Sequence, residues 1–459
     1  MKVSNELLEK YNVQVPRYTS YPPANHFNDT FSGDDYTSLI TASNLSDPNH
    51  IGFYIHIPFC KQICFYCGCN FIVMVNDDAV KKYIDAVKEE IRLTIKDIDK
   101  SRKVTQIHYG GGTPNAINSV FLKELNQLLF DNFEFIDNPE IAIECNPALL
   151  TWEYMDQLFD AGFNRFSFGI QDFDPDILRN VNRLPSALPV DELIQYVKKH
   201  DPKMSVNLDF IYGLPQQDAE SFGETIKKAI AMRPDRIVTF SYAHVPWMKT
   251  HQRILEKKGL PNAEEKMEMF LTAYKLMKDG GYIPIGLDHY ALPEDELAVA
   301  LNDHKLHRNF QGYCTKRTTG QVYGFGVSSI GQLTEGYAQN TKDQFKYISQ
   351  INKGILPVEK GYKVKAHEII IREVINELMC NKYINWDKLG ESLNISADKI
   401  KQTVGYNAEV LESFKADDLL NYDENEIHIT ELGTVFIRNI VAAFDPALKQ
   451  SEKQYSKSL

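Results

Sequence analysis

The strongest constraint on the fold is an alternation of short apolar runs with amphipathic segments, which extends from about residue 52 to residue 290. The apolar runs are FYIHIPF, QIHYGG, IAIECNP, RFSFGIQ, SVNLDFIYGLP, RIVTFSYAHVP and YIPIGLDHY. Between the runs, apolar residues recur at spacings of three and four, as they do at Val80, Ile84, Val87, Ile91 and Ile95. Strand, helix and strand in repetition predict βαβ units and a parallel sheet, so we expect an α/β fold.

Two flanks of the chain lack this alternation. Residues 1–50 contain VPRYTSYPPANHF, which is rich in Pro, Tyr and Ser and has no period, so we expect an extended arm. From about residue 363 the chain becomes helical, as AHEIIIREVINELM and LGTVFIRNIVAAF indicate, with a turn and strand at YDENEIHIT. We therefore expect three parts: an arm over 1–50, the α/β unit with its extension over 51–362, and a smaller, mainly helical domain over 363–459.

Polar or glycine-rich positions follow the apolar runs. In parallel barrels and open α/β sheets, sites are built at the C-terminal ends of the strands. Any one of these positions could simply begin a loop, but so many at equivalent strand ends predict one shared cavity. The positions are Gly110 to Thr113, Glu144, Gln171, Asp209, His244, and Asp288 with His289.

Composition excludes several classes of protein. The formal net charge of -12 argues against a general binder of nucleic acid or anionic membranes, because clustered Lys and Arg read such surfaces. No apolar run approaches the roughly 18 residues of a membrane span, and MKVSNELLEKYNVQVPRYTSYPP lacks the apolar core of a secretory signal. The chain has seven cysteines, an odd number, and they are clustered. A framework of disulfide bonds would be expected to pair its cysteines, so this set does not resemble one. We expect a cytoplasmic protein with no membrane span and no nucleic-acid partner.

Four of the cysteines lie in the stretch FCKQICFYCGCNF, as Cys60, Cys64, Cys67 and Cys69. A structural zinc site usually takes two separated pairs of ligands, and no second pair follows here. A closed 4Fe-4S cluster needs four thiolates and would have to include Cys69. Three thiolates on a compact loop have another use, because they can hold three irons of a 4Fe-4S cluster and leave the fourth iron open.

The glycine turn of QIHYGGGTPN gives a weak signal by itself, since a tight loop also explains it. No P-loop lysine and no helix-opening G-x-G-x-x-G accompany it, so phosphate binding is not favoured. Glycines let the backbone approach a ligand closely, and their carbonyls can accept hydrogen bonds from an ammonium group. Glu144, at the end of IAIE, is either a surface carboxylate or an acceptor for ribose hydroxyls.

The spacing C-x3-C-x2-C, with Tyr66 before the last cysteine, resembles the signature of the radical S-adenosylmethionine (SAM) superfamily. This resemblance implies a 4Fe-4S cluster on Cys60, Cys64 and Cys67, with SAM chelated to the open iron. It also implies the chemistry: reductive cleavage of SAM gives methionine and a 5'-deoxyadenosyl radical that abstracts hydrogen from the substrate. The resemblance implies that Cys69 is not a ligand.

A narrower resemblance covers nearly the whole chain. The motifs PRYTSYP, YIHIPFC, CFYCGCN, HYGGGTP, FGIQDF, NLDFIYGLP, SYAHVP, LDHYA, HRNFQGY and GFGVSSIG occur in the order of the oxygen-independent coproporphyrinogen III oxidase (dehydrogenase) family. The resemblance implies a partial (β/α)6 barrel with an N-terminal arm and a helical C-terminal domain. It implies conversion of coproporphyrinogen III to protoporphyrinogen IX by oxidative decarboxylation of two propionates to vinyls. It further implies a monomer that takes electrons from an unidentified reductant.

The resemblance also implies two SAM molecules and the residues that hold them. One SAM is expected against Tyr54, Gly111, Glu144 and Ile330. The second is expected near Tyr66, Gly112, Thr113, Gln171, Arg183, Asp209 and Ala243.

The four carboxylates of such a substrate need cations that the acidic chain supplies only locally. Arg17, His307 and Arg308 are the candidates, by their setting in PRYTSYP and HRNFQGY. The alternatives are a haem chaperone of the same lineage, a relative that modifies the haem ring, and a simple iron-sulfur electron carrier. The long arm and Cys69 favour the oxidase, because such chaperones usually lack both.

Overall fold

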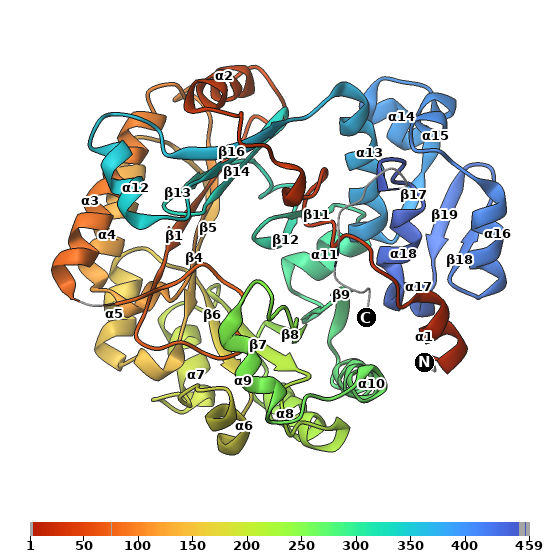
Figure 1. Ribbon diagram of the computed structural model, residues 1–459, viewed down its shortest axis with the longest axis horizontal. Coiled ribbons are helices and arrows are strands. Elements are labelled where there is room, and N and C mark those ends of the chain that lie inside the picture. Colours follow the sequence, from red (N-terminus) through yellow and green to blue (C-terminus); the bar gives the residue numbers. More distant parts are fainter. Residues whose placement is uncertain (1–2, 75, 449–454, 456–459) are drawn as a thin grey trace.

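The computed structural model describes residues 3–74, 76–448 and 455. Its centre is a twelve-stranded sheet in the order β16-β15-β14-β13-β1-β4-β5-β6-β7-β8-β10-β9. The strands from β13 through β8 are parallel, and those outside them are antiparallel. Between the described residues of β9 and β16 no pairing closes the sheet, so the expected partial barrel is confirmed (Figure 1).

Six parallel strands carry the site and follow one another along the chain. They are β1 (Ile51–Ile57), β4 (Val104–Gly111), β5 (Phe135–Cys145), β6 (Arg165–Gln171), β7 (Ser205–Tyr212) and β8 (Arg236–Ser241). The helices between them are α3 (Asp77–Thr94), α4 (Ser119–Phe130), α5 (Trp152–Asp160), α6 (Pro175–Asn180), α7 (Val190–His200) and α8 (Ala219–Met232), followed by α9 (Arg253–Glu256) and α10 (Ala263–Asp279).

Helix α3 shows how the sequence specifies these elements. The side chain of Asn76 accepts a hydrogen bond from the Ala79 amide at 2.9 Å and caps the helix start. The predicted stripe is buried against the sheet, with Val80, Ile84 and Val87 at 2% exposure or less. The apolar period therefore sets the face that the helix buries.

The sheet is extended at both edges. On one side lie β13 (Gln321–Phe325), β14 (Ile330–Leu333), β15 (Gly336–Asn340) and β16 (Val358–Lys363), with helix α12 (Gln344–Ile351). On the other side lie β9 (Ile283–Gly286) and β10 (His289–Ala291), followed by α11 (Glu296–Asn302) and the separate hairpin of β11 (Leu306–Asn309) and β12 (Gly312–Thr315). The run YIPIGLDHY, expected as one strand, thus forms two antiparallel strands, because the chain turns at Leu287 with φ of 40°.

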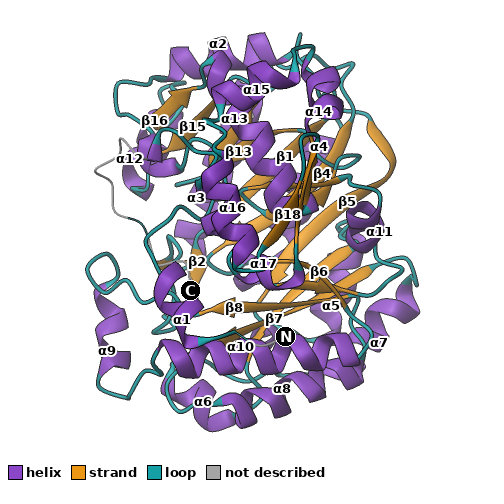
Figure 2. Cartoon of the chain, turned by 90° about the vertical axis from the view of Figure 1, so that its right-hand side faces the viewer, coloured by secondary structure: helices purple, strands orange, loops and turns teal. Residues whose placement is uncertain are grey.

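The C-terminal part has a hydrophobic core of its own. It contains α13 (Ala366–Asn376), α14 (Trp386–Leu393), α15 (Ala397–Thr403), α16 (Ala408–Ala416), α17 (Glu431–Val435) and α18 (Ile437–Ala442). A small sheet of β17 (Tyr383–Asn385), β18 (Leu420–Tyr422) and β19 (Glu426–Ile429) lies among them. Trp386, Ile427 and Ile440 belong to this core, which is separate from the barrel core. In Figure 2 this helical domain faces the viewer and the strands of the barrel lie behind it.

The arm is less extended than expected. It contains helix α1 (Asn5–Tyr11) and helix α2 (Gly33–Ser43), whose starts are capped by Ser4 and Ser32. Between them the chain runs between the barrel and the helical domain (Figure 1). Its residues Tyr11, Tyr18 and Tyr21 are buried in the core of the helical domain. Within the described part of the chain, none of the helices has the length and apolar character needed to cross a membrane.

Candidate functional site

The cysteine loop follows β1, between the short strands β2 (Phe59–Cys60) and β3 (Ile72–Val73). Cys60, Cys64 and Cys67 are free thiols. Burial, with smaller contributions from the nearby Cys67 and Cys64 thiols, raises the pKa of the Cys60 thiol to about 11, although the hydrogen bond with Thr113 acts against the rise. The structure therefore brings the three predicted ligands together. Cys69 lies beside Cys67, and the hydrogen bond between these two thiols lowers the pKa of Cys67 and raises that of Cys69.

Side chains after β8 hold the backbone of this loop. Lys249 Nζ donates to the Cys69 carbonyl at 2.7 Å, and His251 Nε2 lies 2.8 Å from the Cys67 carbonyl oxygen. Gln252 Nε2 donates to the carbonyls of Tyr66 at 2.9 Å and Ala243 at 3.3 Å. Sequence reasoning singled out the preceding motif SYAHVP but missed these three anchors, since nothing in their spacing joins them to a loop about 180 residues earlier.

The donor set fits a 4Fe-4S cluster. Thiolates are the usual ligands of such clusters, and three of them share one compact loop. The guanidinium of Arg183 lies 3.8 Å from Cys64 Sγ, where it can offset thiolate charge. Among the described residues no three His, Cys, Asp or Glu side chains are arranged around a single metal ion. That finding concerns single-ion sites, whereas a cluster spreads its ligands over several irons.

The glycine turn at the end of β4 leaves little space for side chains. A Cβ on Gly110 would lie 2.8 Å from Glu144 Oε1, and one on Gly111, with φ of 119°, would lie 2.7 Å from the His56 ring. A Cβ on Gly112 would lie 2.4 Å from the Pro58 carbonyl oxygen and 3.0 Å from Cys60 Sγ. These glycines therefore let the turn lie directly against both the cysteine loop and Glu144.

Glu144 belongs to a hydrogen-bonded group on β1, β4 and β5. Its Oε1 lies 3.1 Å from His108 Nε2, and the His108 ring stacks on Tyr54 at 6.0 Å. Burial lowers the pKa of His108, but Glu144, together with the charges of Glu140 and Asp209, outweighs it and the net shift is upward. Tyr54 pairs in register with Gly324, where a Cβ would lie 2.8 Å from the Ile330 backbone. The first expected set is therefore adjacent, and His108 is an addition that the sequence analysis missed.

The second expected set lies across β6 and β7. Arg183 donates to the Gly169 carbonyl at 2.5 Å, and a Cβ on Gly169 would lie 2.7 Å from Gln171 Nε2. Gly169 pairs in register with Asp209. Arg183 Nε is buried and has no hydrogen-bond partner, so one donor of the site remains available to a ligand.

Asp209 is half-buried among polar neighbours that sequence reasoning missed. Its carboxylate accepts hydrogen bonds from Ser167 Oγ at 2.5 Å and Asn207 Nδ2 at 2.8 Å. Burial raises its pKa to about 6, despite these bonds. Both partners face Asp209 through strand alternation, a signal that could have identified them.

Thr113 and Tyr66 complete the set beside the cysteine loop. Thr113 Oγ1 lies 3.3 Å from Cys60 Sγ. Tyr66 lies near Arg183 and Cys64, and burial raises its pKa well above the usual value. Gln252 joins Tyr66 to Ala243 through their carbonyls, as described above. The structure thus gathers residues from both expected sets around one end of the barrel.

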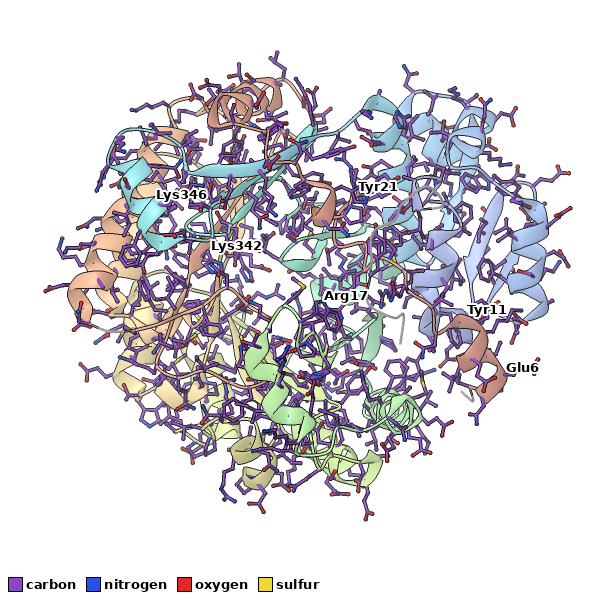
Figure 3. The ribbon with its side chains drawn as sticks, in the orientation of Figure 1. Glu6, Tyr11, Arg17, Tyr21, Lys342 and Lys346 are labelled. Carbon is purple, nitrogen blue, oxygen red and sulfur yellow. The ribbon has the colours of Figure 1, made fainter. Side chains whose placement is uncertain are left out.

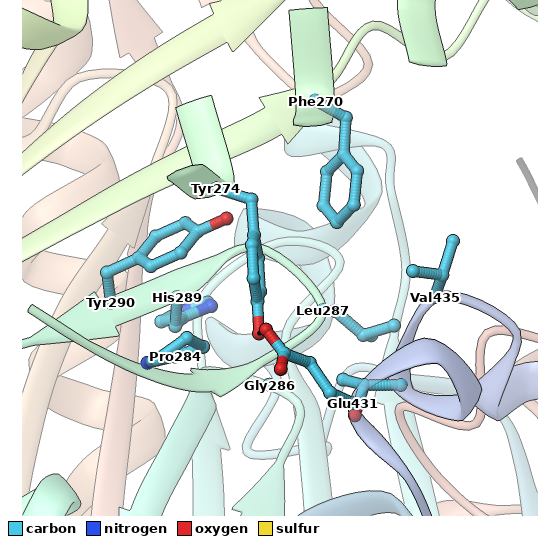
Figure 4. A pocket seen from close by; sticks show the side chains of 10 residues that line it. Phe270, Tyr274, Pro284, Gly286, Leu287, His289, Tyr290, Glu431 and Val435 are labelled. Carbon is cyan, nitrogen blue, oxygen red and sulfur yellow. Dashed lines mark hydrogen bonds between the residues drawn. The ribbon is translucent and has the colours of Figure 1, made fainter. Parts of the chain in front are cut away.

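A small cavity lies at the junction of the barrel and the helical domain, between α10, the β9–β10 turn and α17 (Figure 4). Tyr274 OH donates to Glu431 at 2.9 Å beside it, and His289 is one of its lining residues. Its volume of about 10 Å³ has room for about one water molecule. It is therefore no site for a substrate or cofactor.

A parallel partial barrel with three thiols and a glycine turn at its C-terminal strand ends defines a radical SAM enzyme, and the Radical SAM superfamily model matches residues 54–229. The oxygen-independent coproporphyrinogen III oxidase of Synechocystis sp. is 38% identical over 455 residues, which are 99% of this chain and 97% of the relative. Its counterpart from Helicobacter pylori is 36% identical, with 99% of each chain covered. The chain belongs to the oxygen-independent coproporphyrinogen III oxidase family.

A solved structure agrees with this assignment. Coproporphyrinogen III oxidase from Escherichia coli, described as a radical SAM enzyme, superposes with a TM-score of 0.86 at 34% identity. The match covers 95% of this chain and 100% of that one. The expected fold class and family are thereby confirmed, and the family implies a 4Fe-4S cluster and SAM.

Proposed function

We propose that this chain oxidatively decarboxylates two propionates of coproporphyrinogen III to vinyl groups and so produces protoporphyrinogen IX. The names of its full-length relatives support this reaction. The observation that carries the proposal is the gathering of three free thiols, the glycine turn and Glu144 at one end of an unclosed barrel.

In this proposal Cys60, Cys64 and Cys67 hold the cluster. When bound, the cluster and SAM supply a 5'-deoxyadenosyl radical that removes a hydrogen atom from the substrate propionate. Arg183 stabilises the thiolate charge next to Cys64. Gln252 keeps the loop in place through the Tyr66 carbonyl.

One SAM would lie against Tyr54, Gly111, Glu144 and Ile330. Glu144 has one oxygen beside His108, and the side chain is 46% exposed, so it can still accept hydrogen bonds from ribose hydroxyls. The Gly111 backbone lies at the open end of β4 and offers a carbonyl to an ammonium group.

We propose a second SAM beside the first. Its ligands would be Tyr66, Gly112, Thr113, Gln171, Arg183, Asp209 and Ala243. The unpartnered Nε of Arg183 suits a carboxylate, and the Asp209 carboxylate suits an ammonium or hydroxyl group.

The rest of the proposal concerns the setting of the enzyme. We propose a cytoplasmic monomer that takes single electrons from an external reductant. We also propose that the arm over 1–50, the barrel over 51–362 and the helical domain over 363–459 are its working units, although residues 1–2, 75, 449–454 and 456–459 lie outside the described part.

Anaerobic incubation tests the reaction. The reconstituted protein, SAM, a chemical reductant and coproporphyrinogen III are expected to give protoporphyrinogen IX, detected chromatographically after oxidation. A Cys67→Ala variant should give none. Release of methionine without vinyl formation would contradict the proposal, and tight stoichiometric haem binding without turnover would favour a haem chaperone instead.

A further inference from the structure

Two arginines from distant parts of the chain meet beside the site. Arg308, on β11, donates from its NH1 to the carbonyl of Arg17 on the arm at 3.4 Å. Arg17 is exposed, whereas its neighbours Pro16 and Tyr18 are buried. Among the described residues no carboxylate oxygen lies within 4.0 Å of either guanidinium group. Two cations therefore share a small region without a partner of opposite charge in direct contact.

This pair is connected to the site through the turn between β9 and β10. Burial raises the pKa of Asp288, but His289, Arg308 and Arg17 outweigh it and lower the pKa overall. His289 Nδ1 lies 2.7 Å from Asp288 Oδ1, so that carboxylate already has a closer partner than the arginines. His289 in turn lowers the pKa of Asp209, which burial raises. His289 pairs in register with Val238 on β8, and Val238 pairs with Asp209 on β7, so the turn beside the arginines lies two strands from the second expected set.

A third cation strengthens the local positive charge. Lys266, at the start of α10, donates to the Tyr242 carbonyl at 3.2 Å. Burial lowers its pKa, and the charge of Arg17 lowers it further. A local excess of positive charge in a chain of net charge -12 favours an anionic ligand.

Arg308 is oriented for such a ligand. Its guanidinium lies 5.2 Å from the ring of Tyr313, the residue opposite it in the β11–β12 register. Its Nε is buried and without a hydrogen-bond partner. His307, expected to join this group, is instead kept neutral: burial lowers its pKa to about 4, near Arg372 and Lys316. The strand alternation places His307 on the opposite face from Arg308.

The helical domain holds the arm at this point. The hydroxyls of Tyr18 and Tyr21 donate to the two carboxylate oxygens of Asp445 at 3.1 and 2.9 Å. Arg438 donates to the carbonyls of Val15 and Pro16. Tyr18 has a φ of 49°, a left-handed conformation that a tyrosine adopts only when its surroundings fix it. Figure 3 shows Arg17 and Tyr21 on the arm between the barrel and the helical domain.

We propose that Arg17 and Arg308 together bind a propionate carboxylate of the substrate, and that Asp445 positions Arg17 by holding Tyr18 and Tyr21. The inference rests on the proposed function, because it identifies the groups that recognise the same substrate. Guanidinium groups match carboxylates in shape and charge, and two of them can share one carboxylate. The carboxylate bound here is one that anchors the ring, while the reacting propionate faces the cluster.

Steady-state kinetics of the complete enzyme test the pair. Arg17→Ala and Arg308→Ala should each raise KM for coproporphyrinogen III at least about tenfold, the effect of losing a charged hydrogen bond. The kcat of each variant should stay within about twofold of the wild-type value. The lost interaction stabilises the bound substrate and the transition state equally, so its loss changes KM and not kcat. Lys305→Ala, which removes an exposed cation of the same segment, should leave KM unchanged. An unchanged KM in both arginine variants would overturn the proposal.

A binding measurement separates this inference from the proposed reaction. Coproporphyrin III, the oxidised and unreactive tetracarboxylate, can be titrated into the reconstituted enzyme by fluorescence. Affinity should fall at least about tenfold in Arg17→Ala and Arg308→Ala and change little in Lys305→Ala. If the wild-type enzyme forms no vinyl product but shows this pattern, the reaction is wrong and the anion site stands. If it turns over and the affinities are equal, the site is wrong and the reaction stands.

A double variant tests the positioning role. Asp445→Asn should raise KM with little change in kcat, and Arg17→Lys should recover part of the affinity lost in Arg17→Ala. In an Arg17→Ala background, Asp445→Asn should add nothing to KM, because the residue that it positions is gone. An equal increase in both backgrounds would contradict the role. If Asp445→Asn does not fold, Tyr18→Phe, which removes one of the two bonds, replaces it in the same cycle.

Discussion

At the residue scale, Asp209 combines partial burial with a proposed ligand role that needs its charge. Burial raises its pKa to about 6, and Ser167, Asn207 and His289 act against that rise. The carboxylate is therefore ionised above about pH 6 and becomes protonated as the pH falls through this value. An ionised Asp209 can bind an ammonium group, and a protonated one binds it poorly.

The first prediction concerns the pH dependence of this site. Product formation by the wild type should fall about tenfold per unit as the pH drops below 6. The activity of Asp209→Asn should be at least about tenfold lower than that of the wild type. It should also be nearly independent of pH between 5 and 8. Rates at saturating reductant measure this, and cluster absorbance at each pH is the control. A variant with the wild-type profile would show that another group titrates.

The second prediction concerns the contact of the glycine turn with the cysteine loop. In Gly112→Ala the new Cβ would meet the Pro58 carbonyl at 2.4 Å, so the loop must move. We expect the iron content after reconstitution to fall at least about twofold, with a loss of about 1–3 kcal/mol in stability. In Gly52→Ala the nearest atom is at 3.6 Å, an ordinary contact, and the iron content should be retained. Equal iron in both variants would contradict the steric account.

At the element scale, a buried carboxylate joins helix α3 to the far edge of the sheet. Glu90 accepts hydrogen bonds from the Gly326 amide at 2.8 Å, Asn340 Nδ2 at 2.5 Å and the Tyr347 hydroxyl. Its partners come from the end of β13, from β15 and from α12. Burial raises its pKa to about 7, and these bonds act against the rise.

The third prediction follows from that shift. Because the folded pKa lies above the unfolded one, the stability from Glu90 is complete below pH 4.5 and is lost as the pH rises through about 7. A shift of this size corresponds to roughly 3 kcal/mol. The free energy of unfolding of the wild type should therefore fall relative to Glu90→Gln between pH 5 and 8. A constant difference across this range would show that Glu90 does not titrate there.

The elements themselves could largely be predicted from the sequence. The stripe through Val80 and Ile84 is the buried face of α3, because a helical period leaves little choice of face. The arm was predicted less well: Ser4 and Ser32 are ordinary helix caps that indicate α1 and α2. The turn at Leu287 could not be predicted, because packing imposes a positive φ on a residue type that rarely adopts it.

Some residues of the candidate site could likewise be predicted from the sequence, and others could not. Strand ends and motifs made the cysteines, Glu144 and Asp209 candidates, because local sequence determines where a strand stops. Gln252 and His251 were missed, since their role is to hold a loop far away in the chain. The charge of His307 was misjudged, because burial determines it and no local pattern reports burial of a hairpin.

At the scale of the whole molecule, residues 11–21 of the arm and the helical domain form one structural unit, whereas α2 of the arm packs in the barrel core. Tyr11, Tyr18 and Tyr21 belong to the domain's core, and Asn439 Nδ2 donates to the Tyr11 carbonyl at 2.9 Å. Asp445 is 3% exposed, so its loss would leave two buried tyrosine hydroxyls without an acceptor. Each such group costs about 1–3 kcal/mol.

The fourth prediction is a coupled loss of protection in this unit. In Asp445→Ala, amide hydrogen exchange should accelerate together in residues 11–21 and in α18, by at least about tenfold, while β5 and β6 keep their protection. The matched surface variant Asp303→Ala, which removes an exposed partner of Lys305, should change neither region. Faster exchange in the arm alone would mean that the arm and the domain are not one unit.

We propose that the gathered thiols and strand-end residues direct hydrogen abstraction from a substrate propionate. Coproporphyrinogen III with deuterium at the β-carbons of its propionates tests this most directly, by mass spectrometry of the 5'-deoxyadenosine formed in a single turnover. We expect deuterium in the 5'-deoxyadenosine, in amounts that match the vinyl groups formed. Vinyl product accompanied by unlabelled 5'-deoxyadenosine, or labelled 5'-deoxyadenosine from Cys67→Ala, would contradict the account.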